Sequence, residues 1–211
     1  MILTGETDSR DYVAARCDSQ AMERLKAFIG MLVAENKQQN LVAAATLDSV
    51  WRRHIADSAQ LLDLVPEVSR GTWMDLGSGA GFPGLVIAIM RPDFHVKLVE
   101  SRRLRSDWLS RCVDDLKLDR CIVYASRAET IPAQEVDVLS ARAFAPLPKT
   151  LAIGKSFSTA DTAWLLPKGR SAAQEVADLP LSLRKMFHVE QSISDPHSGI
   201  VVGRIMEKAG R

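Results

Sequence analysis

Four glycines within eight residues, Gly77, Gly79, Gly81 and Gly84, mark the stretch of the chain best suited to hold a ligand. They follow one apolar segment and precede another, so the sequence predicts a strand, a turn and a helix. Glycine permits positive φ and lets the backbone approach a bound molecule closely. In an open α/β sheet, a turn of this kind after the first strand is the usual place of a nucleotide-like ligand.

Two ligands compete for this turn. Residues 79–84 match the G-x-G-x-x-G dinucleotide fingerprint, but Pro83 has no N–H for a pyrophosphate and Asp75 would bring a negative charge near it. The alternative pattern, D-x-G-x-G-x-G at residues 75–81, is typical of S-adenosyl-L-methionine sites. That molecule carries a sulfonium and an ammonium group and no phosphate, so it tolerates a carboxylate. The turn therefore favours the methyl donor over a nicotinamide dinucleotide.

Polar residues also stand at the ends of three later expected strands. Glu100 ends the second strand, where an acid accepts hydrogen bonds from a ribose diol, and both competing ligands contain ribose. Ala128 and Glu129 follow the third strand, in the loop that flanks an adenine in this kind of fold. Arg142 and Phe144 follow the fourth strand and suit guanine or phosphate binding and base stacking, with a surface ion pair and core packing as alternatives.

A further group of polar residues precedes the sheet. His54, Asp57 and Ser58 follow Arg53 and fall on one side of an expected helix. Other basic residues lie near the expected strand ends: Arg102, Arg103, Arg105, Lys168 and Arg170. If these side chains converge around one opening of the site, they form the local basic surface that RNA requires. If they do not, they are ordinary solvated surface charges.

Composition narrows the choice of partner and compartment. The net charge is +1, so a nucleic-acid surface must be local. Three cysteines without a C-x-x-C pair and four scattered histidines predict a reducing cytoplasm and no metal site. The longest apolar run, residues 82–90, is too short to cross a membrane, and the N-terminus has no signal pattern.

Periodicity places these residues on elements. The first third reads as two helices, one capped by Ser19 and one over residues 47–64, while residues 1–18 suggest a mobile or peripheral segment. We predict strands at residues 73–76, 95–100, 121–125, 136–140 and 163–166. Between them we predict helices at residues 85–90, 102–116, 146–157 and 172–179.

Residues 185–206 depart from this alternation of strands and helices. Residues 185–193 and 199–206 predict an antiparallel hairpin that closes a mostly parallel sheet. That ending is typical of a methyltransferase domain. We therefore predict an α/β, Rossmann-like class I S-adenosylmethionine-dependent methyltransferase fold with a seven-stranded sheet at residues 67–211, preceded by a helical extension at residues 1–66.

Taken in their order along the chain, these motifs resemble those of the bacterial 16S ribosomal RNA guanine-N7 methyltransferases, also called glucose-inhibited division protein B. The matching segments lie at residues 40–41, 53–58, 75–84, 100–101, 126–129, 141–145 and 167–169. The family usually has a lysine where this chain has Leu104, and often an arginine near Ser198. The pairing of the Arg-His-Ile-x-Asp-Ser motif with the Gly-Phe-Pro-Gly turn is specific to this family.

The resemblance implies a function and a set of site residues. The implied donor-binding residues are Gly77, Phe82, Glu100, Ala128, Glu129 and Arg142, and the D-x-G-x-G-x-G pattern adds Asp75 and Gly79. The implied substrate is a guanine of 16S rRNA in the small ribosomal subunit, methylated by a cytoplasmic protein that we expect to be a monomer. Because guanine N7 has a lone pair and no proton, no general base is expected. Arg142 and Lys168 would position the base or its phosphates, and Arg53 and His54 would shape the pocket. A non-catalytic adapter that binds the ribosome is the third possibility.

Overall fold

The computed structural model describes residues 2–65 and 70–205. Within them, a seven-stranded sheet has the order β3-β2-β1-β4-β5-β7-β6. Its five parallel strands are β1 (Thr72–Leu76), β2 (His95–Val99), β3 (Cys121–Tyr124), β4 (Val138–Ser140) and β5 (Ala163–Gly169). Strand β7 (Gly199–Gly203) pairs antiparallel with both β5 and β6 (Phe187–Gln191). This topology confirms the predicted Rossmann-like arrangement with a C-terminal hairpin.

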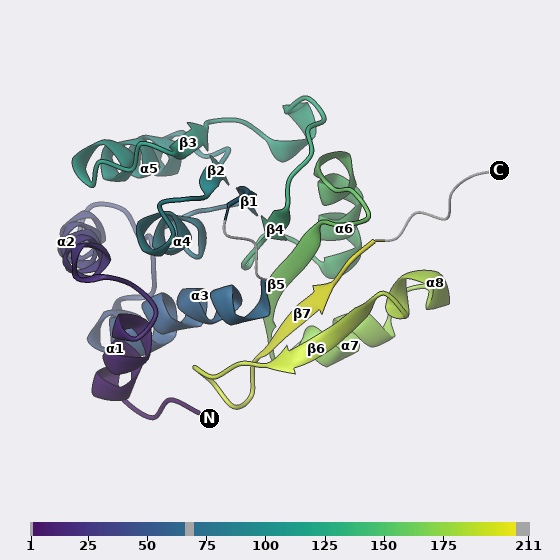
Figure 1. Cartoon of the computed structure of the whole chain (residues 1–211), viewed down its shortest axis with the longest axis horizontal. Helices are drawn as coiled ribbons and strands as arrows, with labels where there is room; N and C mark the ends of the chain where they lie inside the picture. Colours follow the sequence, from purple (N-terminus) through teal and green to yellow (C-terminus); the bar gives the residue numbers. More distant parts are fainter. Residues whose placement is uncertain (1, 66–69, 206–211) are drawn as a thin grey trace.

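Helices cover both faces of the sheet (Figure 1). On one side lie α1 (Glu6–Ala14), α2 (Ser19–Glu35), α3 (Asp57–Ala59), α4 (Gly84–Met90) and α5 (Arg103–Asp115). On the other side lie α6 (Leu147–Gly154), α7 (Ala172–Ala177) and α8 (Leu181–Arg184). Short 3₁₀ turns η4 (Ala128–Thr130) and η5 (Lys155–Phe157) follow β3 and α6.

The core has one cluster on each face of the sheet. Because side chains alternate along a strand, Trp73 and Leu165 pack with the first group of helices, whereas Met74 and Leu166 pack with the second. All four side chains are fully buried. The glycine turn at the end of β1 is therefore fixed between two packed layers.

The prediction of a mobile or peripheral segment at residues 1–18 is wrong. Residues 6–14 form α1, in which Tyr12 and Val13 are buried. The Leu3 N–H donates to the Ile193 carbonyl at 2.8 Å, which places the N-terminal segment beside the turn between β6 and β7 (Figure 1). Helix α1 is mostly polar, so its stability comes from distant contacts such as the 2.6 Å hydrogen bond from the Tyr12 hydroxyl to Asp63.

The two predicted N-terminal helices also differ in detail. The N-cap of α2 is Asp18, whose side chain accepts the Ala21 N–H at 2.7 Å, rather than Ser19. The second predicted helix is a series of turns: η1 (Ala44–Ser49), the π-helical η2 (Trp51–Ala56), α3 and the 3₁₀ turn η3 (Gln60–Leu64). A π turn widens the helix and is frequent at functional sites.

Glu6 joins the N-terminal helix to this π turn. Its carboxylate accepts the N–H groups of Trp51 and Arg52, each at 2.9 Å, and thereby satisfies donors at the start of η2. We expect Glu6→Ala to lower the free energy of unfolding by about 1 kcal/mol in urea denaturation, as for loss of a helix cap. Asp11→Ala, an exposed position on α1, is the control and should change it far less. Equal losses in the two variants would contradict this assignment.

Several boundaries differ from those predicted. Strand β5 continues to Gly169, with a register shift against β7 between Pro167 and Gly169. Helix α8 was not predicted. The predicted division at residues 66–67 and the end of the last predicted strand at residue 206 lie outside the described residues. Among the described residues, no helix has both the length and the apolarity needed to cross a membrane.

Candidate functional site

The glycine turn after β1 needs glycine for two reasons. Gly77, Gly79 and Gly81 have φ values of 70°, 56° and 105°, a region that other residues rarely adopt. A Cβ atom on Gly77 would also lie 2.5 Å from the ring of Phe144. The N–H of Gly77 donates to the Val99 carbonyl at 2.8 Å, so the turn is tied to the end of β2.

The buried side chain of Asp75 links the start of this turn to its end. One carboxylate oxygen accepts the Ser140 hydroxyl at 2.7 Å and the other accepts the Gly84 N–H at 3.2 Å. The side chain is fully buried, and this burial raises the pKa of Asp75 to about 6 against the opposing effect of its hydrogen bonds. Asp75 lines neither of the cavities described below, so it shapes the turn.

A first cavity of about 490 Å³ opens beside the turn. Its wall brings together four of the residues predicted to bind a donor, Gly77, Glu100, Ala128 and Glu129. The Glu100 carboxylate is 6% exposed and accepts the Gly79 N–H at 3.1 Å, so Gly79 supports the wall without lining it. A buried carboxylate among glycine and alanine suits a small polar ligand, and the volume falls within the roughly 300–1,000 Å³ usual for such sites.

The first cavity also has a basic lining. Four cationic side chains contribute to it: Arg102, Arg105, Arg127 and Lys149. The acids of the same lining are Glu100 and Glu129, of which only Glu129 is exposed. Positive charge therefore exceeds negative charge around this opening.

A second cavity, of about 620 Å³, adjoins the first. Arg53, Arg142 and Lys168 line it together with hydroxyl and carboxylate groups from the turn between β6 and β7. Both cavities share residues 143–145, here called the wall segment. Ala143 in this segment has a φ of 52°, a strained value for a residue with a side chain.

Arg142 is held by groups from the N-terminal elements. Its Nε lies 3.5 Å from the Asp57 carboxylate, and its Nη2 donates to the Arg53 carbonyl at 3.3 Å. Nη2 also lies 3.4 Å from Nδ1 of His54, and the guanidinium lies 5.8 Å from the ring centre of Phe82. The remaining nitrogen, Nη1, is buried and has no hydrogen-bond partner among the residues that the structure describes.

His54 is a neutral acceptor in this arrangement. A guanidinium only donates, so Nδ1 accepts from Arg142 and Nε2 carries the proton. Nε2 lies 2.8 Å from the Thr46 hydroxyl, which in turn donates to the Ala43 carbonyl at 2.6 Å. The ring stacks on Phe82 at 4.8 Å and is 5% exposed. Burial, followed by the charges of Arg142 and Arg53, lowers the pKa of His54 to about 3.

This lowered pKa predicts a pH dependence of stability. The unfolded chain binds a proton on His54 below pH 6.5, whereas the folded protein does so only near pH 3. Between these values the unfolded state holds more protons, so acidification destabilises the fold, by up to about 1.4 kcal/mol per pH unit. We expect the stability advantage of the wild type over His54→Asn in urea unfolding to shrink as pH falls from 6.5 toward 3.

Comparing the wild type with His54→Asn isolates the contribution of His54 to the pH dependence of stability. Asp75, whose pKa is raised, has the opposite effect between about pH 4 and 6, but it is present in both proteins and cancels in the difference. Asparagine keeps an acceptor near Nδ1. A stability difference that stays constant with pH would contradict a neutral buried His54.

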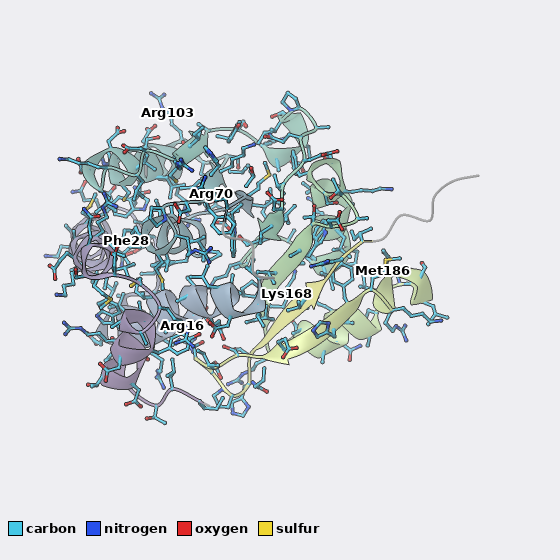
Figure 2. The ribbon with its side chains drawn as sticks, in the orientation of Figure 1. Arg16, Phe28, Arg70, Arg103, Lys168 and Met186 are labelled. Carbon is cyan, nitrogen blue, oxygen red and sulfur yellow. The ribbon has the colours of Figure 1, made fainter. Side chains whose placement is uncertain are left out.

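Lys168 is occupied by protein groups. Its side chain is 8% exposed, and Nζ donates to the Ala145 carbonyl at 2.5 Å and contacts the Glu175 carboxylate at 3.1 Å. In Figure 2 Lys168 lies over β5 and β7, whereas Arg103 points outward from α5. The predicted basic residues therefore divide into three groups: Arg53 and Lys168 line the second cavity, Arg102 and Arg105 line the first, and Arg103 and Arg170 line neither.

Some site residues escaped the sequence analysis. Asp195 forms a 3.1 Å ion pair with Arg53, and the Ser194 hydroxyl donates to Asp57 at 2.5 Å. These partners are more than 130 positions apart in the chain, so no local pattern marks them. Neither His54 nor Phe82 lines either of these two cavities, and both contact the Arg142 guanidinium instead. Among the described residues, no group of three His, Cys, Asp or Glu side chains is placed to hold a metal.

Comparisons with known proteins identify the family of this chain. The model of the family described as rRNA small subunit methyltransferase G, GidB, matches residues 21–199. A protein from Erythrobacter litoralis named ribosomal RNA small subunit methyltransferase G is 54% identical, over 97% of this chain and 98% of that protein. One of the same name from Novosphingobium aromaticivorans is 51% identical, over 98% and 91%.

Solved structures support the fold. A putative S-adenosyl-L-methionine-dependent methyltransferase from Methanococcus maripaludis superposes with a TM-score of 0.56, covering 78% of this chain and 93% of that one. At 11% identity this likeness shows the fold alone. The family model and the two relatives, each of which matches most of this chain, lead to one conclusion. This chain belongs to the GidB family of rRNA small subunit methyltransferase G proteins.

Proposed function

We propose that this protein transfers a methyl group from S-adenosyl-L-methionine to N7 of a guanine in 16S rRNA of the small ribosomal subunit. The observation that carries the proposal is the pair of cavities that share the wall segment at the carboxyl ends of the parallel strands. One has the lining of a nucleoside site and the other presents an arginine. Transfer between two bound molecules requires such adjacent sites.

The first cavity fits the donor. Glu100 would accept the ribose hydroxyls, Ala128 and Glu129 would flank the adenine, and Gly77 allows close approach of the backbone. When bound, the donor supplies an electrophilic methyl carbon on a sulfonium sulfur. Two other residues predicted to bind the donor, Asp75 and Gly79 of the D-x-G-x-G-x-G pattern, act indirectly by fixing the turn and Glu100.

The second cavity suits an acceptor that needs no proton removed. Guanine N7 attacks with its own lone pair, so the residues must orient the base rather than deprotonate it. His54 is neutral and buried behind Arg142, which fits a supporting role. Arg142 would bind the acceptor edge of the base, and alignment of the two reactants supplies roughly 7–11 kcal/mol in favourable cases.

Charge around the first cavity favours RNA as the substrate. The donor carries positive charges at its sulfur and its ammonium group. Binding of the donor therefore does not explain four basic side chains around this cavity. A polyanion bound across the opening would neutralise them, as phosphate contacts do. Because ribosomal RNA is the proposed substrate, we also propose that the protein acts in the cytoplasm, and that it acts there as a monomer.

The N-terminal elements belong to the same functional unit. We propose that residues 1–66 are a helical extension and residues 67–211 the methyltransferase domain. The extension contributes to the second cavity through Arg53 and Asp57, and it supports Arg142 through His54. Its removal should therefore impair the acceptor side of the site as well as the fold.

Methyl transfer to isolated small subunits tests the proposal. Subunits from a strain that lacks the enzyme are incubated with radiolabelled S-adenosyl-L-methionine, and label in 16S rRNA is counted. Incorporation is the expected result. Donor binding without incorporation would favour the adapter hypothesis, and a bound nicotinamide detected by its absorbance would favour an oxidoreductase.

A further inference from the structure

The wall segment between the two cavities is strained and must be held. Ala143 has a φ of 52°, which costs energy for any residue with a Cβ atom and persists only where the surroundings enforce it. The next residue, Phe144, packs so closely on Gly77 that a Cβ atom there would lie 2.5 Å from its ring. A small relaxation of this segment would thus change the spacing between the two cavities.

Four groups form a closed ring around the end of the wall segment. Lys168 donates to the Ala145 carbonyl at 2.5 Å and contacts the Glu175 carboxylate at 3.1 Å. The same Glu175 oxygen accepts the Leu147 N–H at 2.7 Å. We call Lys168 and Glu175 the clamp, because together they bind the backbone on both sides of Pro146.

Local structure explains why the clamp is needed. Helix α6 begins at Leu147 without a side-chain cap of its own, so Glu175 on α7 satisfies a donor at its first turn. Lys168 lies at the register shift of β5 between Pro167 and Gly169, and Gly169 has a φ of 60°. A bulge of this kind redirects a side chain, and here it accompanies a lysine whose side chain is almost fully buried.

We propose that Glu175 is a positioning residue for methyl transfer, acting through Lys168 to keep the wall segment between the donor and the acceptor. This inference rests on the proposed function. The clamp holds the carboxyl end of the wall segment, while Arg142, held by Asp57, precedes its amino end. The two attachments fix the spacing of the cavities, on which alignment of the reacting atoms depends.

Glu175→Gln tests the clamp. Glutamine retains an acceptor for the Leu147 N–H and removes the charge that binds Lys168. In single-turnover transfer to small subunits at saturating donor, we expect the rate to fall about 10- to 100-fold. The dissociation constant of S-adenosylhomocysteine, measured by calorimetry, should stay within about twofold. Adding Ala143→Gly to this variant should restore part of the rate, because glycine adopts positive φ without strain.

Controls separate the clamp from folding and from the proposed function. Gln174→Ala, at an exposed position on α7, should retain the wild-type rate. If thermal unfolding shows that Glu175→Gln does not fold, Lys168→Met is tested with and without Ala143→Gly, because Lys168 lines the second cavity and only a clamp role predicts that Ala143→Gly restores part of the rate. If the wild type is active and Glu175→Gln has the same rate, the clamp proposal is overturned. It is also overturned if the rate of Glu175→Gln falls in proportion to its donor affinity and Ala143→Gly does not restore it. A wild type without activity would instead contradict the proposed function.

Discussion

Arg142→Ala should reduce the rate of methyl transfer by about 100- to 1,000-fold, the range observed when one preorganised polar group at a reacting centre is removed. The side chain lines the second cavity, and its guanidinium is fixed by Asp57, His54 and the Arg53 carbonyl. Its buried Nη1 lacks a partner among the described residues, so the arrangement retains an unused donor. Single-turnover kinetics with small subunits measure the effect.

Arg142→Lys serves as the matched variant. It keeps the charge and loses the planar fork that contacts several partners at once, so its rate should lie between those of the wild type and Arg142→Ala. Calorimetry with S-adenosylhomocysteine separates the acceptor side from the donor side. The resemblance assigns Arg142 to donor binding, but the side chain lines the second cavity and not the first, so we expect little change in donor affinity. Full activity in Arg142→Ala would show that the side chain has no part in the reaction.

Gly77→Ala should weaken donor binding at least about 30-fold. An alanine at a φ of 70° costs about 1–2 kcal/mol. Its Cβ atom would also meet the Phe144 ring at 2.5 Å, and such overpacking costs about 1–3 kcal/mol. The smallest sum, about 2 kcal/mol, corresponds to the stated factor if the donor-binding conformation bears the cost. Equilibrium binding of the methyl donor and its demethylated product measures it.

Gly30→Ala is the control for adding a methyl group to the chain. Gly30 lies in α2, no heavy atom outside the adjacent helix backbone and chain neighbours lies within 4 Å of a Cβ built there, and alanine favours a helix. Donor affinity should be unchanged and stability equal or higher. Undiminished donor binding by Gly77→Ala would mean that Phe144 moves freely, which would contradict a fixed wall segment.

The sheet was predictable because its strands are short apolar runs separated by turns. Strand β1 was predicted to within one residue, and the hairpin β6–β7 was predicted from two strand-like runs joined by a polar turn. Strand β5 was predicted too short, because Pro167 and Gly169 suggest an end where the structure has a register shift. Helix α1 escaped prediction because contacts with distant residues such as Asp63 hold it.

The site divides in the same way. Residues at strand ends, such as Glu100 and Arg142, could be identified because topology brings the carboxyl ends of parallel strands to one edge. Their partners could not. Asp195 pairs with Arg53 across 142 positions, and the link between Glu175 and Lys168 depends on the irregular end of β5. The burial that keeps His54 neutral is likewise a property of packing, which single-sequence patterns do not encode.

The most direct test is to identify the methylated nucleoside. Small subunits that lack the modification are incubated with the protein and isotopically labelled S-adenosyl-L-methionine, and the digested 16S rRNA is analysed by chromatography and mass spectrometry. Our account predicts label in 7-methylguanosine at one position of the RNA. Label on an exocyclic amine, on ribose or on another base would contradict the lone-pair mechanism, and no label despite donor binding would contradict the enzyme assignment.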